Sequence, residues 1–401
     1  MNSSTTSFES TGTSNARLLG VLLCMCALVL AVIAAANMLV DPYGLYPGIH
    51  LDNLRPYESK RGSRVAKGDD LALGGYRTIL FGSSRTEVGF DPQHPILSPQ
   101  PVYNAALSGT SMLELHQLYE FARAHNALTT ILFALDFHLF AERRGFGDDY
   151  EASRIAGGRP EIIYHFDNLL SHRALTATID SLKRMLRGAP SNYDEYGFRR
   201  TGLAESRKNT MEMSALRLRH FYSAPDLFGD FRLSEARLAD FSALVRRESV
   251  GNQVIVILIP PVHALLLETI HAAGLWEDFA RFKRELAELD DAGVLVFDFT
   301  GYNQYTTEPL PIEHPDASMQ WYWEPSHFRK ELGDLALSIA FSAHWTDPPV
   351  LAPTSFGQRL TPEMIEAQLA RIDAEREAWL AGAGDQMAWL GRVIGQPRVD
   401  E

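Results

Sequence analysis

The sequence has only two cysteines, Cys24 and Cys26, and both lie in one long apolar run near the N-terminus. The rest of the chain has no thiol, which excludes a disulfide, a cysteine nucleophile and a thiolate metal site there. The chain also lacks net positive charge, since its formal charge is −13 at pH 7. This acidic balance opposes binding to phosphate backbones, so we exclude nucleic acid as a partner.

The apolar run covers residues 18–40, contains no charged residue, and is bracketed by Arg17 and Asp41. Crossing the ~30 Å hydrocarbon core takes roughly 20 helical residues, so the run predicts a single transmembrane helix. A cleaved signal peptide is the alternative, but its apolar region usually has only ~7–15 residues. We therefore expect this helix to tether the chain to a membrane.

Basic residues follow the span and bear on its orientation. By the positive-inside rule they favour a cytoplasmic location for the part after the helix. They begin at the edge of the rule's reach of about 15–20 residues, and large domains often cross regardless of such charges. We interpret them as a solvated face of a stalk, with attraction to anionic lipid headgroups as the alternative. They are Arg55, Lys60, Arg61, Arg64 and Lys67.

Short apolar runs alternate with helical patterns along the rest of the chain. Runs that are apolar throughout and bounded by turn residues suit strands buried on both faces of a parallel sheet. The alternation predicts a doubly wound, flavodoxin-like α/β domain, with a parallel sheet sandwiched by helices. Strands are expected at residues 78–81, 102–105, 129–135, 254–259 and 294–297, and helices at 112–122, 233–247, 276–289 and 329–343. Thr110 and Ser111 are candidate caps of the helix at 112–122, with Glu114 three residues after Ser111.

Domain boundaries follow from composition. Residues 41–75 carry Pro and Gly punctuation and are expected to form a stalk, and residues 76–345 the α/β domain. A polar, Gly- and Arg-rich insertion at 138–230 interrupts this domain and is expected to cover its site. Within the insertion a helix is predicted at 175–186. Residues 346–401 are expected to be a Pro-rich linker and a charged surface helix at 361–380.

A candidate active site emerges at the strand ends, where open α/β sheets bind their ligands. Ser84 follows the first predicted strand in a Gly-containing turn that leads into a helix, and N–H groups at such a turn can bind an oxyanion. A serine nucleophile needs a base, and His327, with Glu324 three residues earlier, can be base and orienting acid. The alternatives are a capping serine, a surface histidine and an exposed glutamate.

These segments resemble motifs of the SGNH/GDSL hydrolase superfamily. Phe81-Gly82-Ser83-Ser84 resembles its nucleophile block, and the segment from Asn104 to Gly109 resembles its second block, whose glycine N–H joins the oxyanion hole. Glu324-Pro325-Ser326-His327 resembles the terminal Asp-x-x-His, with glutamate in place of aspartate. Together with Asp41-Pro42-Tyr43-Gly44 after the apolar run, they resemble an envelope subgroup of bacterial proteins similar to alginate O-acetyltransferase-type polysaccharide-modifying proteins.

The resemblance implies a membrane-anchored acyltransferase or esterase that acts on cell-envelope polysaccharide, with O-acetyl groups as the expected target. It implies a single-pass protein of the bacterial inner membrane, with residues 1–17 in the cytoplasm and the soluble domain in the periplasm. Polysaccharide and envelope assembly proteins are the implied partners. Ser84, His327 and Glu324 are the implied catalytic residues, and Gly109, Asn104 and Arg85 the oxyanion or substrate-binding residues.

One departure from the family pattern leaves alternatives open. The third block, Gly-x-Asn-Asp, is replaced by Ala134-Leu135-Asp136-Phe137-His138, so the asparagine donor is absent. A carboxylate near an oxyanion is unfavourable unless it is protonated or turned away. Slow acyl transfer stays open, as does acyl chemistry with a different donor supplied by the insertion at 138–230. Otherwise the chain is a catalytically inactive scaffold that binds polysaccharide or assembly partners, or a structural membrane protein whose helix at 361–380 docks a partner.

Other candidate residues have structural alternatives. Arg85 can form an ion pair with Glu87 or Asp91 instead of binding an anionic substrate group. Strand-end carboxylates such as Asp136 and Asp298 are more often turn or capping groups than catalysts. A metal held by Asp136, His138 and His263 would need ligand spacing that nothing in the sequence fixes, so we expect neither metal nor cofactor. The aromatic residues 321–323 suit a core or a wall that stacks on sugar rings.

Overall fold

The structure, a computed structural model of the chain, describes residues 10–46, 48–49, 51, 53–200, 209–345 and 356–395. The chain forms two compact units, each built from two separate stretches of sequence. Unit 1 consists of Met1–Ala66 and Ala152–Ser191, and unit 2 of Lys67–Glu151 and Asn192–Glu401. The predicted insertion at 138–230 is therefore divided: its middle part belongs to unit 1, together with the N-terminal segment.

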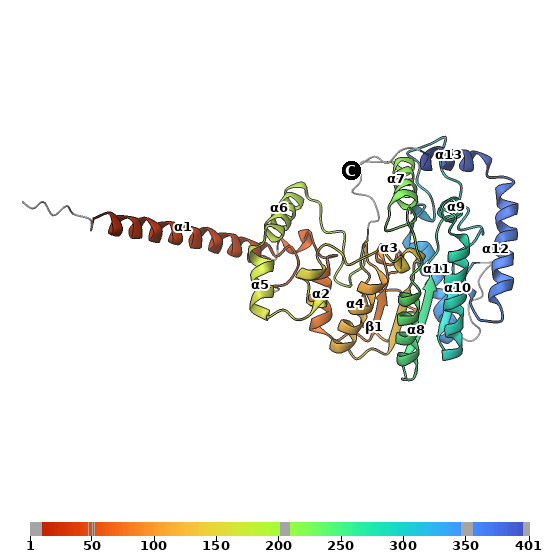
Figure 1. The fold of residues 1–401 in the computed structure, drawn as a ribbon, viewed down its shortest axis with the longest axis horizontal. Coiled ribbons are helices and arrows are strands. Elements are labelled where there is room, and N and C mark those ends of the chain that lie inside the picture. The colour runs from red at the N-terminus through yellow and green to blue at the C-terminus, as the bar shows by residue number, and fades with distance from the viewer. Residues whose placement is uncertain are drawn as a thin grey trace, which may run out of the picture. The chain divides into compact units, whose positions relative to one another are not determined.

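Unit 1 is helical and contains the N-terminal apolar helix α1 (Ser10–Val40). Over Asn15–Val40, α1 is long and apolar enough to cross a membrane, a criterion that a signal sequence also meets. Two further helices, α5 (Glu161–Leu170) and α6 (His172–Arg187), lie beside the C-terminal end of α1 (Figure 1). The helix predicted at 175–186 is confirmed as α6. Shorter elements are η1 (Arg55–Tyr57), η3 (Tyr150–Ala152) and η4 (Arg154–Ala156).

The predicted stalk at 41–75 is instead largely folded. Asp41 adopts a left-handed conformation (φ 45°), and its carboxylate accepts the N–H groups of Leu45 (2.8 Å) and Tyr46 (2.6 Å). Helix α2 (Arg64–Leu73) follows and continues into unit 2. The Pro and Gly residues therefore mark a hydrogen-bonded turn within a folded unit. The buried cluster of unit 1 consists of Tyr43, Val65, Ala66, Ala152, Tyr164, Ala174 and Ala177.

Unit 2 contains a six-stranded sheet in the order β2-β1-β3-β4-β5-β8. Strands β1 to β5 are parallel, and β8 pairs antiparallel with β5. The order 2-1-3-4-5 is that of doubly wound, flavodoxin-like sheets. All five predicted strands are confirmed within two residues at each end, and β8 was not predicted. The bounds are β1 Thr78–Phe81, β2 Val102–Asn104, β3 Thr130–Ala134, β4 Val254–Ile259, β5 Leu295–Asp298 and β8 Gln358–Arg359.

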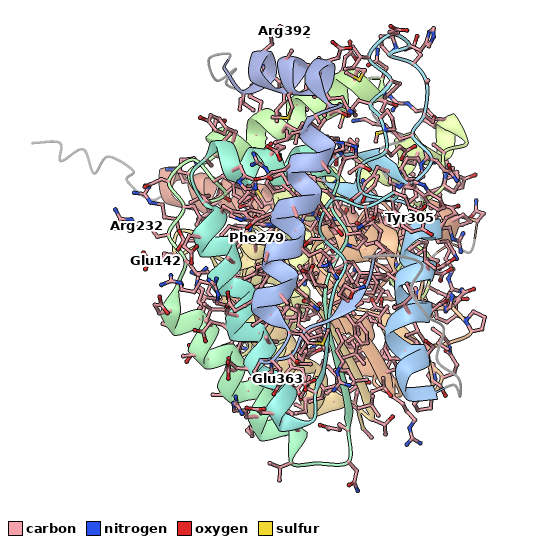
Figure 2. The ribbon with its side chains drawn as sticks, turned by 90° about the vertical axis from the view of Figure 1, so that its right-hand side faces the viewer. Glu142, Arg232, Phe279, Tyr305, Glu363 and Arg392 are labelled. Carbon is pink, nitrogen blue, oxygen red and sulfur yellow. The ribbon has the colours of Figure 1, made fainter. Side chains whose placement is uncertain are left out.

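Helices cover both faces of this sheet. In Figure 2, α8 (Glu235–Ser249) and α10 (Trp276–Ala287) lie along one side and α11 (Lys330–Trp345) along the other. The four helices predicted at 112–122, 233–247, 276–289 and 329–343 are confirmed as α4, α8, α10 and α11. Ser111 caps α4 (Met112–His125), as predicted, because its Oγ accepts the N–H of Glu114 (3.2 Å). Other elements are α3 (Ser84–Gly89), η2 (Phe137–Phe140), α7 (Thr210–Ser223), α9 (Ala264–Ala272) and η5 (Glu288–Ala292).

The C-terminal helices α12 (Ile365–Leu380) and α13 (Gly384–Ile394) belong to unit 2. One face of α12 is buried through Ile365, Leu369 and Ile372. Arg376 on α12 donates two hydrogen bonds of 2.7 Å to the buried carboxylate of Glu268 on α9. The helix predicted at 361–380 thus exists but is packed into its own unit, which weighs against a helix held free for a partner. The predicted linker lies mostly outside the described residues.

Candidate active site

Ser84 stands at the carboxyl end of β1, as the first residue of α3. Gly82 allows the tight turn before it, because a Cβ atom on Gly82 would lie 2.1 Å from Oγ1 of Thr86. Ser83 is the N-cap of α3, since its Oγ accepts the N–H of Arg85 (3.2 Å). The alternative considered for Ser84 was that it caps this helix. Ser83 has that role instead, so the Ser84 hydroxyl is not used as a cap.

His327 lies opposite Glu324 in a short antiparallel hairpin formed by β6 (Tyr322–Glu324) and β7 (His327–Phe328). Nε2 of His327 is 2.8 Å from Oγ of Ser84. Nδ1 of the same ring contacts Oε1 of Glu324 within hydrogen-bonding distance. When Nε2 accepts the serine hydroxyl, Nδ1 carries the hydrogen that it donates to the carboxylate. The hydroxyl, imidazole and carboxylate therefore form one hydrogen-bonded series, the arrangement of an activated nucleophile with its base and orienting acid.

The Glu324 carboxylate is fully buried but well supplied with donors. Its Oε2 accepts the N–H of Ser326 (2.8 Å), and its Oε1 accepts the Ser326 hydroxyl (2.6 Å). Burial alone would raise the pKa of Glu324. Interactions with His327, Arg217 and Ser326 outweigh that effect, and the pKa falls below the ordinary glutamate value. Glu324 is therefore ionised at neutral pH and can stabilise a protonated His327.

Arg85 and Asp136 connect this hairpin to the sheet. The guanidinium of Arg85 forms an ion pair with Asp136 and donates from Nε to the carbonyl of Ser326 (2.7 Å). Asp136 also accepts the hydroxyl of Ser83. The partner of Arg85 is thus neither Glu87 nor Asp91. Because Arg85 is buried in these contacts, the prediction that it binds substrate is corrected to a role in holding the Ser326–His327 turn. The carboxylate of Asp136 is turned toward Arg85.

A pocket of about 150 Å³ opens at the Ser84–His327 pair. Its polar lining comes from the loop that carries Ser108 and Gly109 and from two arginines of the predicted insertion. The Nε atoms of Arg199 and Arg217 are buried and lack a hydrogen-bond partner within the described part of the chain. The pocket therefore places cationic donors within reach of a bound group. Its lining residues are Ser84, Val88, Ser108, Gly109, Arg199, Arg217 and His327.

The segment from Asn104 to Gly109 lies beside this pocket, but only its last two residues, Ser108 and Gly109, line the pocket. Gly109 has a φ of +71°, a conformation that favours glycine. Asn104 is fully buried, and its Nδ2 donates to the carbonyls of Thr86 (2.8 Å) and Phe90 (2.9 Å). The predicted substrate-binding role of Asn104 is therefore corrected. Its amide holds the end of α3 against β2, and Gly109 alone of the two is open to a ligand.

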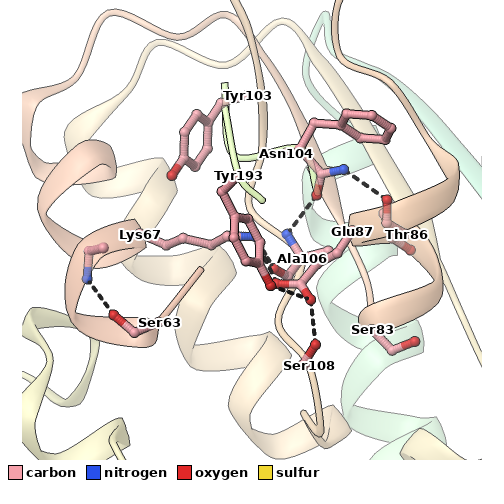
Figure 3. A network of polar contacts seen from close by, with 12 residues as sticks. Ser63, Lys67, Ser83, Thr86, Glu87, Tyr103, Asn104, Ala106, Ser108 and Tyr193 are labelled. Atoms are coloured by element: carbon pink, nitrogen blue, oxygen red, sulfur yellow. Dashed lines mark hydrogen bonds and ion pairs between the residues drawn. The ribbon is translucent and has the colours of Figure 1, made fainter. Parts of the chain in front are cut away.

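A buried ion pair supports the same loop from behind (Figure 3). Lys67 and Glu87 are fully buried, with Nζ and Oε1 3.1 Å apart. Glu87 also accepts the hydroxyls of Ser108 and Tyr193 (3.3 Å to Tyr193), and Lys67 donates to the carbonyl of Ala106. Burial lowers the pKa of Lys67, and Glu87 opposes that effect. Since Glu87 lies one turn after Ser84 on α3, the pair joins α3 to the loop of Ser108 and Gly109. Lys67, predicted on a solvated stalk face, is instead in the core.

The histidines considered as metal ligands have other roles. His263 caps α9, as its Nδ1 accepts the N–H of Leu265 (3.1 Å) and its Nε2 donates to the carbonyl of Glu308 (2.6 Å). Burial lowers its pKa to about 4. Burial, with Arg144 and Arg85 nearby, also holds the pKa of His138 well below its usual value. Among the described residues no group of three His, Cys, Asp or Glu side chains could hold a metal ion. Asp298 forms a turn with Thr300 and an ion pair with Lys283.

Several residues of the site could not be recognised in the sequence. Arg199 lies outside any predicted element, and Arg217 lies on α7, a helix that was not predicted, so only the fold brings them to the pocket. Ser326 is part of the Glu-x-x-His motif, but its hydrogen bonds to Glu324 depend on the hairpin turn. Lys67 and Glu87 are separated by β1 in the chain, and nothing in the sequence indicates that they pair.

Comparison with family models and with curated proteins gives no match to this chain. The class of the site therefore rests on its geometry. Ser84, His327 and Glu324 form a hydrogen-bonded series at the carboxyl edge of a doubly wound sheet, next to a polar pocket. Such a series can produce a serine nucleophile, and its position matches the edge where doubly wound folds bind ligands.

Proposed function

We propose that this chain is a serine-dependent acyltransferase or esterase of the SGNH-like type, acting on O-acetyl groups of cell-envelope polysaccharide. The observation that carries the proposal is the 2.8 Å contact between Oγ of Ser84 and Nε2 of His327, residues far apart in the chain. The buried, ionised Glu324 behind His327 supports it, because an imidazole that accepts a proton is stabilised by an adjacent carboxylate.

The chemistry follows from these contacts. Oγ of Ser84 attacks the acyl carbonyl while its proton passes to Nε2 of His327. The ester C–O bond then breaks, and His327 returns the proton to the departing alkoxide oxygen. An acceptor hydroxyl, or water in the esterase case, gives its proton to His327 and attacks the acyl carbonyl of the acylated serine. The bond from the acyl carbon to Oγ then breaks, and His327 returns the proton to Oγ of Ser84. Glu324 remains ionised and keeps Nδ1 protonated throughout.

The developing oxyanion needs donors, and the asparagine of the family is missing. Backbone N–H groups of Ser84 and Gly109 are the first candidates. Arg199 and Arg217 offer a replacement for the asparagine, since both line the pocket and have Nε atoms without a partner among the described residues. Two guanidinium groups also favour a substrate that carries negative charge near the ester, such as an acidic sugar.

The proposal includes retention of α1 as an anchor in a bacterial inner membrane, with unit 2 in the periplasm. The last turn of α1 supports retention, because it is part of the fold of unit 1. Asn37 is buried there, and its Nδ2 donates to the carbonyl of Leu169 on α5 (2.6 Å). Cleavage before Asn37 would separate the apolar run from a turn that this hydrogen bond holds in place.

A second candidate is a catalytically inactive scaffold that binds polysaccharide or assembly partners. It is favoured by one observation, the presence of Asp136 where the family has its asparagine donor. The ion pair with Arg85 weakens this argument, because it directs the carboxylate away from the pocket and compensates its charge. Turnover separates the two candidates: a scaffold binds the glycan but never forms a bond to Ser84.

The test is covalent labelling of the full-length protein in detergent micelles with a fluorophosphonate, followed by an assay with a chromogenic acetyl ester and acetylated glycan. We expect labelling at Ser84 that is lost in Ser84→Ala and His327→Ala. Ser249→Ala, at the end of α8, is the control and should label like the wild type. Absence of labelling, together with glycan binding that survives both active-site substitutions, would overturn the proposal in favour of the scaffold.

A further inference from the structure

Unit 1 exposes apolar side chains on α5, a helix that adjoins the end of α1. Ile162 is 77% exposed, Ile163 47% and Phe166 57%. Their spacing of three and four residues places them on one face of the helix. The opposite face is used for packing, since Tyr164 and Asn168 are buried. A short helix with one packed face and one exposed apolar face is unusual for a surface in water.

The exposed face of α5 is tied to the C-terminal end of α1. Leu169, one turn after Phe166, accepts the Asn37 side-chain hydrogen bond of 2.6 Å from the last turn of α1. In Figure 1, α5 runs crosswise to α1 at that end. If α1 crosses a bilayer along its length, a crosswise helix at its end lies in the plane of the bilayer surface.

A second segment adds apolar groups at the same end of α1. The N–H of Leu51 donates to the carbonyl of Leu39 in the last turn of α1 (2.9 Å). Leu39, Ile49 and Leu51 are all exposed. Two separate segments of unit 1 therefore present apolar side chains next to the end of the helix that can cross a membrane, so the apolar surface is continuous with α1.

The neighbouring helix α6 has the composition of an interfacial helix. Leu175, Ile179, Leu182 and Leu186 recur at intervals of three and four residues along one stripe, and Leu186 is 81% exposed. Its other residues include Arg173, Lys183, Arg184 and Arg187. Helices that rest on membranes combine an apolar face with basic residues that meet anionic headgroups.

The charged residues of α5 are largely neutralised by partners in unit 1. Arg154 donates two hydrogen bonds to the Glu161 carboxylate (2.6 and 2.7 Å), and Arg159 pairs with Asp167 (2.5 Å). Paired carboxylates lower the electrostatic cost of approaching an anionic headgroup layer. The two acidic groups next to the apolar face thus do not oppose contact with lipid.

We propose that the apolar face of α5 and the loop with Ile49 and Leu51 lie within the interface of the same bilayer that α1 crosses. The occupant of this surface is lipid. The inference rests on the proposed anchoring by α1 but not on the acyl chemistry. Its consequence is that unit 1 rests on the membrane and is held there by more than one helix.

The test places single spin labels on the full-length chain in nanodiscs of phosphatidylethanolamine and phosphatidylglycerol, in a Cys24→Ala/Cys26→Ala background. Labels go to Ile162→Cys and Phe166→Cys on α5, to Leu28→Cys in α1, and to Val250→Cys as the exposed apolar control in unit 2. We expect the ratio of collisions with oxygen to collisions with a water-soluble nickel chelate to be severalfold higher at 162 and 166 than at 250.

Each other outcome would overturn the inference. Water access at 162 and 166, with lipid access at 28, would remove the interfacial contact and leave the anchor intact. Access of the water-soluble chelate to the label at 28 would also contradict the anchoring of the chain by α1. Spin–spin broadening at 166 would show that two labelled chains lie close together, so that a second copy of the chain, and not lipid, covers the surface.

A measurement on the unsubstituted protein guards against effects of the labels. Phe166 and Phe146 have similar exposure in the chain, and Phe146 belongs to unit 2. In nanodiscs, hydroxyl radicals should modify Phe166 severalfold less than Phe146. Equal modification of the two rings would contradict the contact with lipid.

Discussion

The ring of Phe328 lies directly against Gly89, so that a Cβ atom on Gly89 would come within 2.0 Å of the Phe328 ring. Gly333 on α11 approaches the same point, because its own Cβ would lie 1.7 Å from the Gly89 carbonyl oxygen. This close packing holds β7 against α3. It explains how His327, the neighbour of Phe328, reaches Ser84 at the other end of α3.

Gly89→Ala therefore should separate the side chains of Ser84 and His327. The added methyl group forces Phe328 away, and overpacking of this kind costs about 1–3 kcal/mol of unfolding free energy. We expect a lower urea midpoint and slower fluorophosphonate labelling of Ser84. Gly391→Ala on α13 is the matched control, since a Cβ atom there would have no other atom within 4 Å and helix propensity favours alanine by about 0.5–1 kcal/mol. Wild-type labelling in Gly89→Ala would contradict this explanation.

Glu324→Gln tests the orienting carboxylate. The amide cannot stabilise a protonated His327, and loss of the third member of such a series lowers turnover about 10⁴-fold. The pKa of Glu324 is depressed in the folded state, so its contribution to stability is present at neutral pH and is lost as the pH falls through that lowered value. The ordinary pKa of glutamate is about 4. Below that pH, urea unfolding should show a smaller difference in unfolding free energy between the wild type and Glu324→Gln. A turnover drop of less than tenfold would remove Glu324 from the mechanism.

The buried pair of Lys67 and Glu87 provides a test of the support behind the pocket. Lys67→Met leaves Glu87 buried without its cation and should lower the unfolding free energy by about 3–5 kcal/mol. The double variant Lys67→Met/Glu87→Leu should recover part of that loss, because no uncompensated charge remains. It should still label slowly at Ser84, since Ser108 has lost its acceptor. Lys183→Met on the exposed face of α6 should change stability by less than about 0.5 kcal/mol. The single variant Glu87→Leu completes the comparison. If the double variant loses the sum of the unfolding free energies that the two single variants lose, the pairing is contradicted.

Arg217 is predicted to act on acidic substrates. Arg217→Gln removes a charged donor, a loss of about 1.5–3 kcal/mol for a hydrogen bond to a charged group. We expect KM for an acetylated acidic sugar to rise by about tenfold or more, because 1.4 kcal/mol corresponds to a factor of ten. KM for a neutral acetyl ester should change much less. Arg187→Gln on α6 serves as the control. Equal rises in KM for both esters would show that Arg217 has no role in recognising the negative charge of the sugar.

His263 makes stability depend on pH. Its pKa is about 4 in the folded chain, against about 6.5 for an ordinary histidine, so the unfolded state binds the proton more readily between these values. Stability should therefore fall as the pH drops from about 6.5 toward 4, by about 2 kcal/mol per group between pH 7 and 5. In urea unfolding, His263→Gln should lose less unfolding free energy than the wild type between pH 7 and 5. An unchanged pH dependence would show that His263 titrates normally.

Much of the sheet, and the meeting of Ser84, His327 and Glu324, could be predicted because both depend on local signals. Strands such as residues 254–259 are apolar throughout, and Ser84 and His327 lie in short motifs with a defined chemical purpose. Asn104 and Arg85 were misassigned, since a motif identifies residue types but not the direction of a side chain. Both amide and guanidinium are buried in contacts with α3 and the Ser326 turn.

The division into units could not be predicted. Residues 41–66 look like a linker because their Pro and Gly content is high, but the Asp41 turn and the packing of Tyr43 and Val65 depend on helices about 100 residues later. The same holds for Arg199 and Arg217, whose position at the pocket is a consequence of tertiary structure alone. β8 was also missed, because two residues are too few for a periodic signal.

The most direct test of the central claim is mass spectrometry of the full-length protein quenched during reaction with an acetyl donor. We predict one added acetyl group on the peptide that contains Ser84. The group should be absent in Ser84→Ala and His327→Ala, and it should persist longer when no acceptor is present. An acetyl donor that turns over without ever modifying that peptide, or modification that persists in His327→Ala at the wild-type rate, would contradict it.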